Sequence, residues 1–404
     1  VRERLAQRAS PGRKWQRHEA AGTNEERSGS TEIMRSKIRI ATVYKRELSD
    51  GFAPTKMSTI RWLRISECLA ARGYRVDMVM NGPGFALSRN PNLRRVPFSR
   101  VDWKRYDLIK TLFHSGFEVI WENGGRDHPF IISKLGSVVG DRDETDGVHF
   151  FKRERERLYS IQERIRHTSR YVTLLSAPSR TLWEEQFGST DNLLLVPTGV
   201  DREVPEPRRN PYKRFSERIV VYIGNIYEET QREVNELWQT RLNNLGAKLR
   251  RRGMRLCFIG TGRVDRIDAK AVTLLGAVHN SQIWDYQYFA DVGLVLAQGK
   301  TQHNESSKLY YYVRTGLPVV SEAPVPNNFL IEATGMGFVA DYGDDGMIVD
   351  MIEAALHRDW HREDGIRYMV ENHTWEKRVD TYDVLIRREL GLEDSPLGAV
   401  PETA

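Results

Sequence analysis

The sequence predicts an α/β fold in which two doubly wound parallel sheets follow one another along the chain. Short apolar runs of strand length alternate with amphipathic runs of helix length from residue 37 to residue 390. Repeated strand–helix units of this kind build parallel sheets with helices on both faces. The proline-rich, charged stretch 202–217 interrupts the alternation once. A chain of 404 residues is longer than a domain with a single hydrophobic core usually is. We therefore expect two domains joined by this linker.

The first series opens with a buried strand at 38–44, an amphipathic helix at 57–73 and a strand at 74–80. The elements expected after it are helix 108–113, strand 117–124, helix 127–135, strand 136–141, helix 150–169, strand 171–179, helix 181–188 and strand 192–201. The second series is expected to comprise strand 218–226, helix 228–251, strands 255–262 and 272–278, helix 283–290, strand 292–297, a short helix near residue 307, strands 318–322 and 337–342, and helices 344–357 and 374–390. Each series therefore predicts a doubly wound sheet of its own.

Composition and charge narrow the possible functions. The net charge of +6 and the pI near 9.2 indicate an anionic ligand or an anionic membrane surface, and we expect no nucleic-acid partner. Only Cys68 and Cys257 are present, which excludes a disulfide framework or a cysteine metal site and fits a reducing cytoplasm. No apolar run reaches the ~18 residues that span a bilayer. Any membrane contact would therefore be peripheral.

The segment 303–322 carries the most informative chemistry. Ser306 and Ser307 supply hydroxyls suited to capping a short helix. Lys308 then falls in the first turn, where the helix dipole disfavours a cation by up to ~1 kcal/mol. A lysine is favourable there when an anion binds the free N–H groups of the same turn. The segment predicts a phosphate site, and the alternative is a lysine that is solvated or paired with Glu305.

Several segments, in this order, carry a family likeness: YVTLLSAPSRTLWEEQFG with LLLVPTGVD, then FIGTG, GAVHNSQIWDYQYFADVGLVLA, SSKLYYYVRTGLPVVSE and ENHTWEKRVDTYDVLI. Together they resemble GT-B-fold, nucleotide-sugar-dependent glycosyltransferases of the type that builds bacterial polysaccharides. The SSK–x7–G–x–P arrangement is similar to the xanthan glucuronosyltransferase type, in which the lysine contacts the donor diphosphate. The resemblance implies two Rossmann-like domains that face a cleft and a transfer of sugar from a nucleotide-diphosphate donor to a hydroxyl.

The resemblance also assigns roles to the expected parts. The acceptor would bind the first domain and the nucleotide sugar the second, and the terminal helix would return to the first domain. The parts are a disordered extension 1–34, the first domain 35–205, the second domain 206–373, the terminal helix 374–392 and a tail 393–404. Met34 precedes the first expected strand by a few residues and leaves open that the true start lies there. Many retaining members carry a glutamate pair, but His303 and Tyr311 occupy those positions here, so retention or inversion stays open.

The expected donor site gathers residues from several loops of the second domain. Gly260 and Gly262 follow a strand, where backbone N–H groups can approach a phosphate or ribose, although a lone G-x-G is often only a turn. The segment 276–284 would recognise the nucleobase. The complete expected set is Lys308, Ser307, Ser306, Tyr311, Gly260, Gly262, Asn225 and His279.

The acceptor side needs a base that takes the hydroxyl proton. Asp141 and Asp143 follow the expected strand 136–141, where the resemblance places a catalytic aspartate; the alternatives are a helix cap or His149 as the base. Gly51 and Thr55 lie in a long loop that could shape the acceptor pocket. GT-B enzymes as a class need no protein-bound metal, and no DxD-type cluster follows a strand of the second domain, so we expect no metal and no cofactor.

A basic surface on the first domain would suit an acceptor linked to lipid. The basic residues are the run 153–157, Arg61, Arg64, Lys104, Arg105 and Lys110, and Trp62 and Trp103 are expected to be exposed beside them. Such a surface can contact anionic headgroups on the cytoplasmic face of a membrane, although solvated helix faces explain the same residues.

The partners expected from all of this are a nucleotide sugar and a glycan or lipid-linked acceptor. Two other functions of the same fold stay open, a nucleotide-sugar 2-epimerase and a non-catalytic nucleotide-sugar-binding protein. A dinucleotide dehydrogenase is disfavoured, because IRIATVYKRELSDG lacks the G-x-G-x-x-G fingerprint after the first strand.

Overall fold

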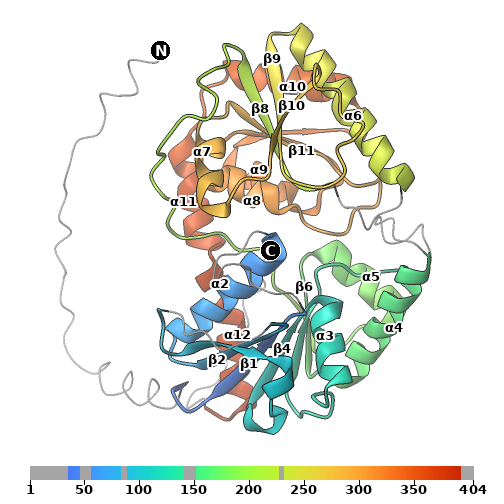
Figure 1. The fold of residues 1–404 in the computed structure, drawn as a ribbon, viewed down its shortest axis with the longest axis vertical. Coiled ribbons are helices and arrows are strands. Elements are labelled where there is room, and N and C mark those ends of the chain that lie inside the picture. The colour runs from blue at the N-terminus through green and yellow to red at the C-terminus, as the bar shows by residue number, and fades with distance from the viewer. Residues whose placement is uncertain (1–34, 46–55, 83–88, 141–151, 227–231, 393–404) are drawn as a thin grey trace, which may run out of the picture.

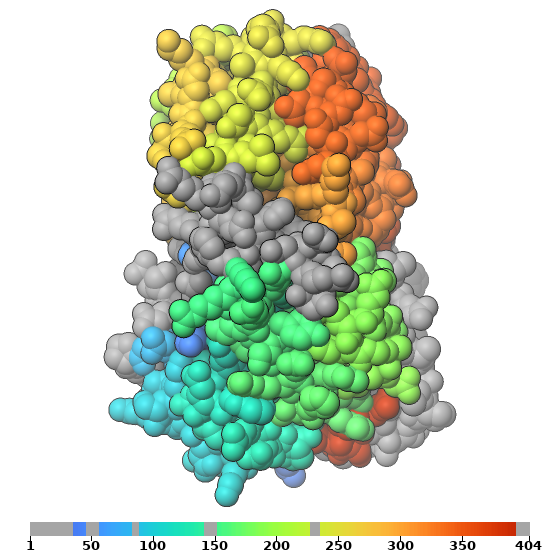
Figure 2. Space-filling model, turned by 90° about the vertical axis from the view of Figure 1, so that its right-hand side faces the viewer, coloured from blue at the N-terminus to red at the C-terminus, as the bar shows by residue number. Residues whose placement is uncertain are grey.

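The computed structural model describes residues 35–45, 56–82, 89–140, 152–226 and 232–392. Within these ranges the chain forms two lobes, each a parallel sheet between two layers of helices (Figure 1). The predicted fold class, α/β with two Rossmann-like doubly wound sheets, is confirmed. The first lobe lies below the second in Figure 2, and the red carboxyl-terminal residues reappear at the base of the first lobe.

The first lobe is built on a seven-stranded parallel sheet in the order β3-β2-β1-β4-β5-β6-β7. Its strands are β1 Arg39–Val43, β2 Arg75–Met80, β3 Leu93–Pro97, β4 Leu108–Leu112, β5 Ile131–Lys134, β6 Tyr171–Leu174 and β7 Leu193–Leu195. The strand order reverses between β1 and β4. The carboxyl ends of these two strands therefore form the topological switch point of the sheet.

Helices cover both faces of this sheet. One face packs against α2 (Met57–Ala71) and the terminal helix α12 (Trp375–Glu389), and the other against α3 (Phe113–Glu122), α4 (Lys152–Thr168) and α5 (Ala177–Phe187). Ion pairing and hydrogen bonding fix α12 to the first lobe, because Asp383 accepts from the Tyr74 hydroxyl at 2.7 Å and from Arg35 at 2.8 Å. The helix α12 is thereby part of the first core.

The sequence prediction is wrong between residues 108 and 141. The segment predicted as helix 108–113 is the strand β4, and the predicted strand 117–124 lies in the helix α3. Within the predicted helix 127–135 the structure has the strand β5, and residues 136–140 form no strand. All five residues of β4 are buried, so their apolar run gives no period that separates strand from helix.

The second lobe is built on a six-stranded parallel sheet in the order β10-β9-β8-β11-β12-β13. Its strands are β8 Arg218–Ile223, β9 Met254–Ile259, β10 Val272–Gly276, β11 Val292–Val295, β12 Val319–Glu322 and β13 Gly337–Ala340. Its helices are α6 Arg232–Arg251, α7 Ile283–Tyr288, α8 Ser307–Arg314, α9 Phe329–Thr334, α10 Asp345–His357 and α11 Arg362–Asn372. Short 3-10 turns, η1 Phe98–Arg100, η2 Trp103–Arg105, η3 Asn280–Gln282 and η4 Pro326–Asn328, complete the two lobes.

A buried carboxylate ties the elements of the second lobe together. Glu322, at the end of β12, is fully buried and accepts hydrogen bonds from the backbone of Ala297 and Gly343, both at 2.8 Å. Arg241 of α6 pairs with both of its oxygens and also reaches Asp345 at 3.0 Å. One carboxylate therefore connects the ends of three neighbouring strands to a helix.

The chain crosses between the lobes at two adjacent points. Val200 donates its N–H to the carbonyl of His373 at 2.9 Å, and Trp375 donates to the carbonyl of Val200 at 3.1 Å. A Cβ on Gly199 would lie 2.5 Å from the Trp375 ring, so only glycine leaves room for that ring. Residues 202–217, predicted as the linker, contain no helix or strand and lead into β8.

We expect Glu322→Ala to destabilise the second lobe by about 3–5 kcal/mol, because the half-buried Arg241 and the N–H groups of Ala297 and Gly343 would lose the buried carboxylate that they share. Chemical unfolding followed by fluorescence would measure the loss. The matched control is Glu353→Ala, which removes an exposed ion pair to Arg252 and should change stability by less than about 0.5 kcal/mol. Equal effects of the two substitutions would contradict this account of Glu322.

Candidate active site

The switch point of the second sheet lies between β8 and β11, where the strand order reverses. Ligands of open α/β sheets bind in the crevice outside the carboxyl ends of strands at this place. The loop 224–226 leaves β8 there, and the chain that leaves β11 leads to the amino terminus of α8. The predicted residues Asn225 and Lys308 therefore come from the two elements that border the switch point.

Two glycine-containing loops pack directly on each other at this edge. A Cβ on Gly260 would lie 1.6 Å from the Gly224 carbonyl oxygen, and one on Gly262 would lie 1.7 Å from the Ile226 carbonyl oxygen. The Asn225 side chain accepts hydrogen bonds from the N–H and the hydroxyl of Thr261, both at 3.0 Å. The close approach of the two loops thus explains both glycines of the G-x-G, and it brings Asn225 to the same place.

The amino terminus of α8 has no side-chain cap. The Ser306 hydroxyl makes no cap hydrogen bond; the Asn327 side chain instead accepts from the Ser306 N–H at 2.8 Å and donates to its carbonyl at 2.9 Å. The following N–H groups of the first turn, beginning with Ser307, keep the partial positive charge of the helix end. This eight-residue helix can therefore hold an anion at its start.

Lys308 lies folded over the loop that follows β8. Its ammonium is 4.9 Å from the centre of the Tyr222 ring, and a Cβ on Gly224 would lie 2.8 Å from the lysine Cε. The side chain is half-buried, and burial lowers the pKa of Lys308 to about 8. Among the described residues no carboxylate pairs with it, so neither predicted alternative, free solvation or a pair with Glu305, describes this lysine.

The other predicted donor residues are placed as follows. Tyr311 is buried in the core of the second lobe, with its ring 5.5 Å from that of Trp284, and it does not join Lys308. His279 is exposed and caps η3, where its Nδ1 lies 2.8 Å from the Ser281 hydroxyl. The turn before it borders the glycine loops, because Gly260 donates its N–H to the Gly276 carbonyl at 2.9 Å. The structure thus brings Lys308, Ser306, Ser307, Asn225 and the glycine loops together and leaves Tyr311 apart.

Sequence reasoning missed two contributors to this site, Tyr222 and Gly224. Tyr222 supplies the ring under Lys308, and its own ring stacks on Phe258 at 5.8 Å. Gly224 supplies the space for the lysine side chain. The only signal in the sequence is a glycine directly after the strand 218–223, which is not specific.

On the first lobe, the predicted Asp141, Asp143, Gly51 and Thr55 and the runner-up His149 lie outside the described residues. The segment that leads to Asp141 leaves the strand β5 and is described up to Gly140. Sequence reasoning also missed His114, which follows β4 at the switch point of the first sheet. Its Nε2 lies 3.1 Å from the Gln162 amide oxygen, and burial lowers the pKa of His114 to about 4, so the ring is neutral at pH 7 and a weak base.

The basic surface predicted on the first domain does not exist in the form expected. Trp62 and Trp103 are buried, and so are Arg61 and Lys110. Lys110 lies with its ammonium 4.6 Å from the centre of the Tyr382 ring, inside the lobe. None of the helices in the described part of the chain has the length and apolar character needed to cross a bilayer.

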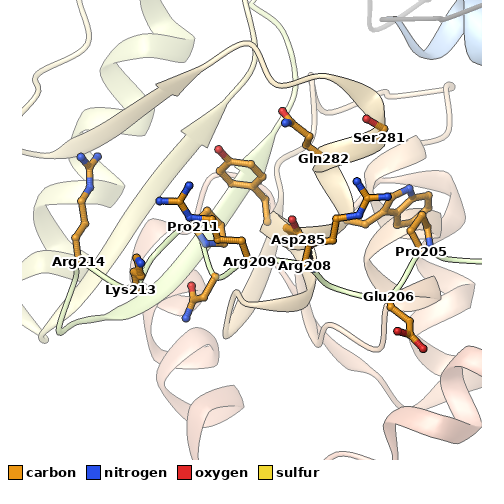
Figure 3. A pocket seen from close by; sticks show the side chains of 13 residues that line it. Pro205, Glu206, Arg208, Arg209, Pro211, Lys213, Arg214, Ser281, Gln282 and Asp285 are labelled. Atoms are coloured by element: carbon orange, nitrogen blue, oxygen red, sulfur yellow. Dashed lines mark hydrogen bonds between the residues drawn. The ribbon is translucent and has the colours of Figure 1, made fainter.

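A pocket of about 510 Å³ lies on the second lobe between the interlobe linker and α7 (Figure 3). Arg208, Arg209, Lys213 and Arg214 of the linker border it, opposite Ser281, Gln282 and Asp285. Asp285 accepts from the backbone N–H of Arg208 at 2.8 Å and so fixes the linker to α7. None of the eight residues named for the donor site lines this pocket, but Ser281, Gln282 and Trp284 of the segment expected to recognise the nucleobase do.

No protein-family profile matches this sequence, and no curated protein matches it. Solved structures do match over nearly the whole chain. Sucrose-phosphate synthase from Thermosynechococcus elongatus is 16% identical with a TM-score of 0.66, and the match covers 88% of this chain and all of that one (100%). HepE of Anabaena, in complex with UDP and glucose, is 11% identical with a TM-score of 0.63 over 88% and 98% of the two chains. WaaG, a glycosyltransferase of lipopolysaccharide biosynthesis, is 15% identical with a TM-score of 0.54 over 89% and 100%. The chain therefore has the GT-B fold.

The glycine loops give a test of this geometry. We expect Gly260→Ala to destabilise the protein by about 3 kcal/mol, because the added Cβ would collide with a backbone carbonyl. Gly224→Ala should cost less than about 1 kcal/mol, since only the flexible end of Lys308 must move. Chemical unfolding of both variants would measure the difference. Similar losses for the two substitutions would rule out the described packing.

Proposed function

We propose that this chain, folded as a GT-B protein, transfers a sugar from a nucleotide-diphosphate donor to a hydroxyl group of a glycan or a lipid-linked acceptor. One observation carries the proposal: a half-buried lysine without a carboxylate partner among the described residues lies in the first turn of an uncapped helix. That helix begins at the switch point of the second sheet. An anion with two or more charged oxygens, such as a diphosphate, fits both features.

The chemistry assigned to this site is charge compensation. In the transfer, the bond between the sugar's anomeric carbon and the diphosphate oxygen breaks, and a bond to the acceptor oxygen forms. The leaving diphosphate gains negative charge, which Lys308 and the first N–H groups of α8 stabilise. The acceptor proton passes to a base on the first lobe, for which we propose Asp141 or Asp143. Because Lys308 and α8 supply the positive charge, the proposal requires no resident metal or cofactor.

The structural neighbours support a uridine nucleotide as the first probe. HepE of Anabaena was solved with UDP and glucose, and a trehalose-6-phosphate enzyme of E. coli, 10% identical with a TM-score of 0.61, with UDP-2-fluoro glucose. The likeness to both is at the level of the fold. The donor sugar and the acceptor are therefore to be found by screening UDP-sugars against glycan and lipid-linked acceptors.

We expect Lys308→Ala to weaken UDP binding and to lower the turnover of a UDP-sugar by at least ~10-fold, the effect of losing one charge-assisted contact. Calorimetry and donor consumption would measure the two effects. Lys300→Ala is the matched control, because Lys300 is an exposed lysine before the same helix, and it should behave as the wild type. Unchanged binding in Lys308→Ala would end the assignment.

The products of the reaction separate this proposal from the other functions of the fold. Transfer requires an acceptor and yields a glycoside and UDP. Consumption of donor without acceptor and with an isomeric nucleotide sugar as product would show an epimerase instead. Tight binding of UDP without any consumption of donor, across the acceptors tested, would show a binding protein.

The pH dependence of UDP binding gives a further prediction. Burial holds the pKa of Lys308 near 8 in the free protein, so the ammonium is charged at pH 7 and loses its proton as the pH rises through about 8. A bound diphosphate favours the charged form, so binding above that pH requires uptake of a proton. We expect UDP affinity to fall by about tenfold per pH unit above pH 8. Calorimetry from pH 7 to pH 9.5 would test this, and the slope should vanish in Lys308→Ala.

A further inference from the structure

Residues 303–305, which precede the N-cap residue of α8, belong to the second lobe, but they are held by the first. The carbonyl of His303 accepts hydrogen bonds from the hydroxyls of Ser176 and Ser179, the latter at 2.8 Å. Asn304 donates from its amide to the Ser137 hydroxyl at 3.0 Å. The approach to the proposed phosphate site is therefore fixed by contacts across the lobe boundary.

Glu305 makes the connection that also reaches into α8. One carboxylate oxygen accepts the backbone N–H of Thr198 in the first lobe at 3.0 Å, and the other accepts the hydroxyl of Tyr310 in α8 at 2.6 Å. The Tyr310 side chain is fully buried. A single carboxylate thus joins the backbone of one lobe to the first turns of the helix that carries Lys308.

The segment that receives Glu305 is itself firmly held. The Thr198 carbonyl accepts from Arg378 of α12 at 3.1 Å, and its hydroxyl accepts from Arg61 of α2 at 2.8 Å. The neighbouring Val196 carbonyl accepts from the buried ammonium of Lys134. Arg378 and Arg61 therefore hold Thr198, and Lys134 holds the neighbouring Val196. Arg378 and Lys134 also attract the Glu305 carboxylate electrostatically.

The position of Glu305 constrains the position of Lys308. The two residues are less than one helical turn apart, and Ser306 between them is clamped by Asn327. A displacement of Glu305 must therefore move the first turn of α8. The position of the lysine ammonium depends in this way on a contact made in the other lobe.

We propose that Glu305 is a positioning residue that couples nucleotide binding to the arrangement of the two lobes through its hydrogen bond to Thr198. The inference rests on the proposed function and adds that nucleotide binding at this site is regulated by the arrangement of the two lobes. Coupling of this kind is reciprocal: if the contact favours the diphosphate, a bound diphosphate must stabilise the contact. The Thr198 N–H is the donor in question, so its hydrogen exchange reports the coupling directly.

The experiment compares the wild-type protein with Glu305→Gln, with and without UDP. A glutamine keeps one acceptor oxygen but removes the negative charge that strengthens the hydrogen bonds from Thr198 and Tyr310, and its amide nitrogen cannot accept from either. In the wild type we expect UDP to slow exchange at the Thr198 amide by ~10-fold. In Glu305→Gln we expect this protection to disappear and the Kd for UDP to rise by ~10-fold.

The control is Asp383→Asn, which weakens another buried carboxylate contact, between α12 and Tyr74, away from α8. It should lower the melting temperature and leave the Kd for UDP unchanged. Tyr310→Phe is a second variant that keeps the buried ring and the Thr198 contact, and it serves if Glu305→Gln does not fold. We expect it to weaken UDP binding by about threefold.

The outcomes separate this inference from the proposed function. Wild-type UDP affinity and Thr198 protection in Glu305→Gln would overturn the inference alone. An equal loss of affinity in Asp383→Asn would overturn it as well, because the effect would then be general destabilisation. Absence of UDP binding to the wild-type protein would overturn the proposed function, and the inference with it.

Discussion

A half-buried ammonium at the positive end of a helix is electrostatically unfavourable, and contacts within the second lobe hold it in place. Burial disfavours the charge of Lys308, and the dipole of α8 opposes it. The Tyr222 ring offers the ammonium a weak attraction, and the missing side chain of Gly224 leaves room for it. An anion bound at the same helix end would offset the effects of burial and of the dipole, which supports the proposed phosphate site.

The rest of the molecule fixes where that ammonium lies. Tyr312 of α8 accepts the backbone N–H of Ile223 at 2.9 Å, so the helix is docked on the strand that carries Tyr222. On the other side, Glu305 connects the helix start to Thr198 in the first lobe. The groups that form the site thus come from the second lobe, whereas contacts with both lobes hold them in position. In the proposed function this interlobe contact links donor binding to the arrangement of the two lobes.

The sequence allowed the two-sheet architecture to be predicted, because regular alternation of strand and helix is typical of this fold; the phosphate site stays a prediction. Alternation of strand and helix identified the sheets, and the serines before Lys308 indicated the start of α8, although Ser306 makes no cap hydrogen bond there. The prediction for residues 108–141 was wrong because buried strands and buried helix faces both give short apolar runs. Lys110 was also predicted to lie on the surface, although its ammonium lies on the Tyr382 ring. Because β4 was predicted as a helix, His114, which follows this strand, was not recognised as a residue of the switch point. The loop packing that requires Gly260 and Gly262, and the contact between Glu305 and Thr198, join residues distant in sequence and could not be predicted from it.

The most direct test of the account is the number of protons taken up when UDP binds, obtained by calorimetry in buffers of different ionisation enthalpy. If the ammonium of Lys308 meets the diphosphate, its pKa rises from about 8 on binding. The wild-type protein should then take up roughly three-quarters of a proton at pH 8.5, and Lys308→Ala should take up none. UDP binding with no proton uptake at that pH, or with the same uptake in both proteins, would contradict the central claim that this lysine holds the donor.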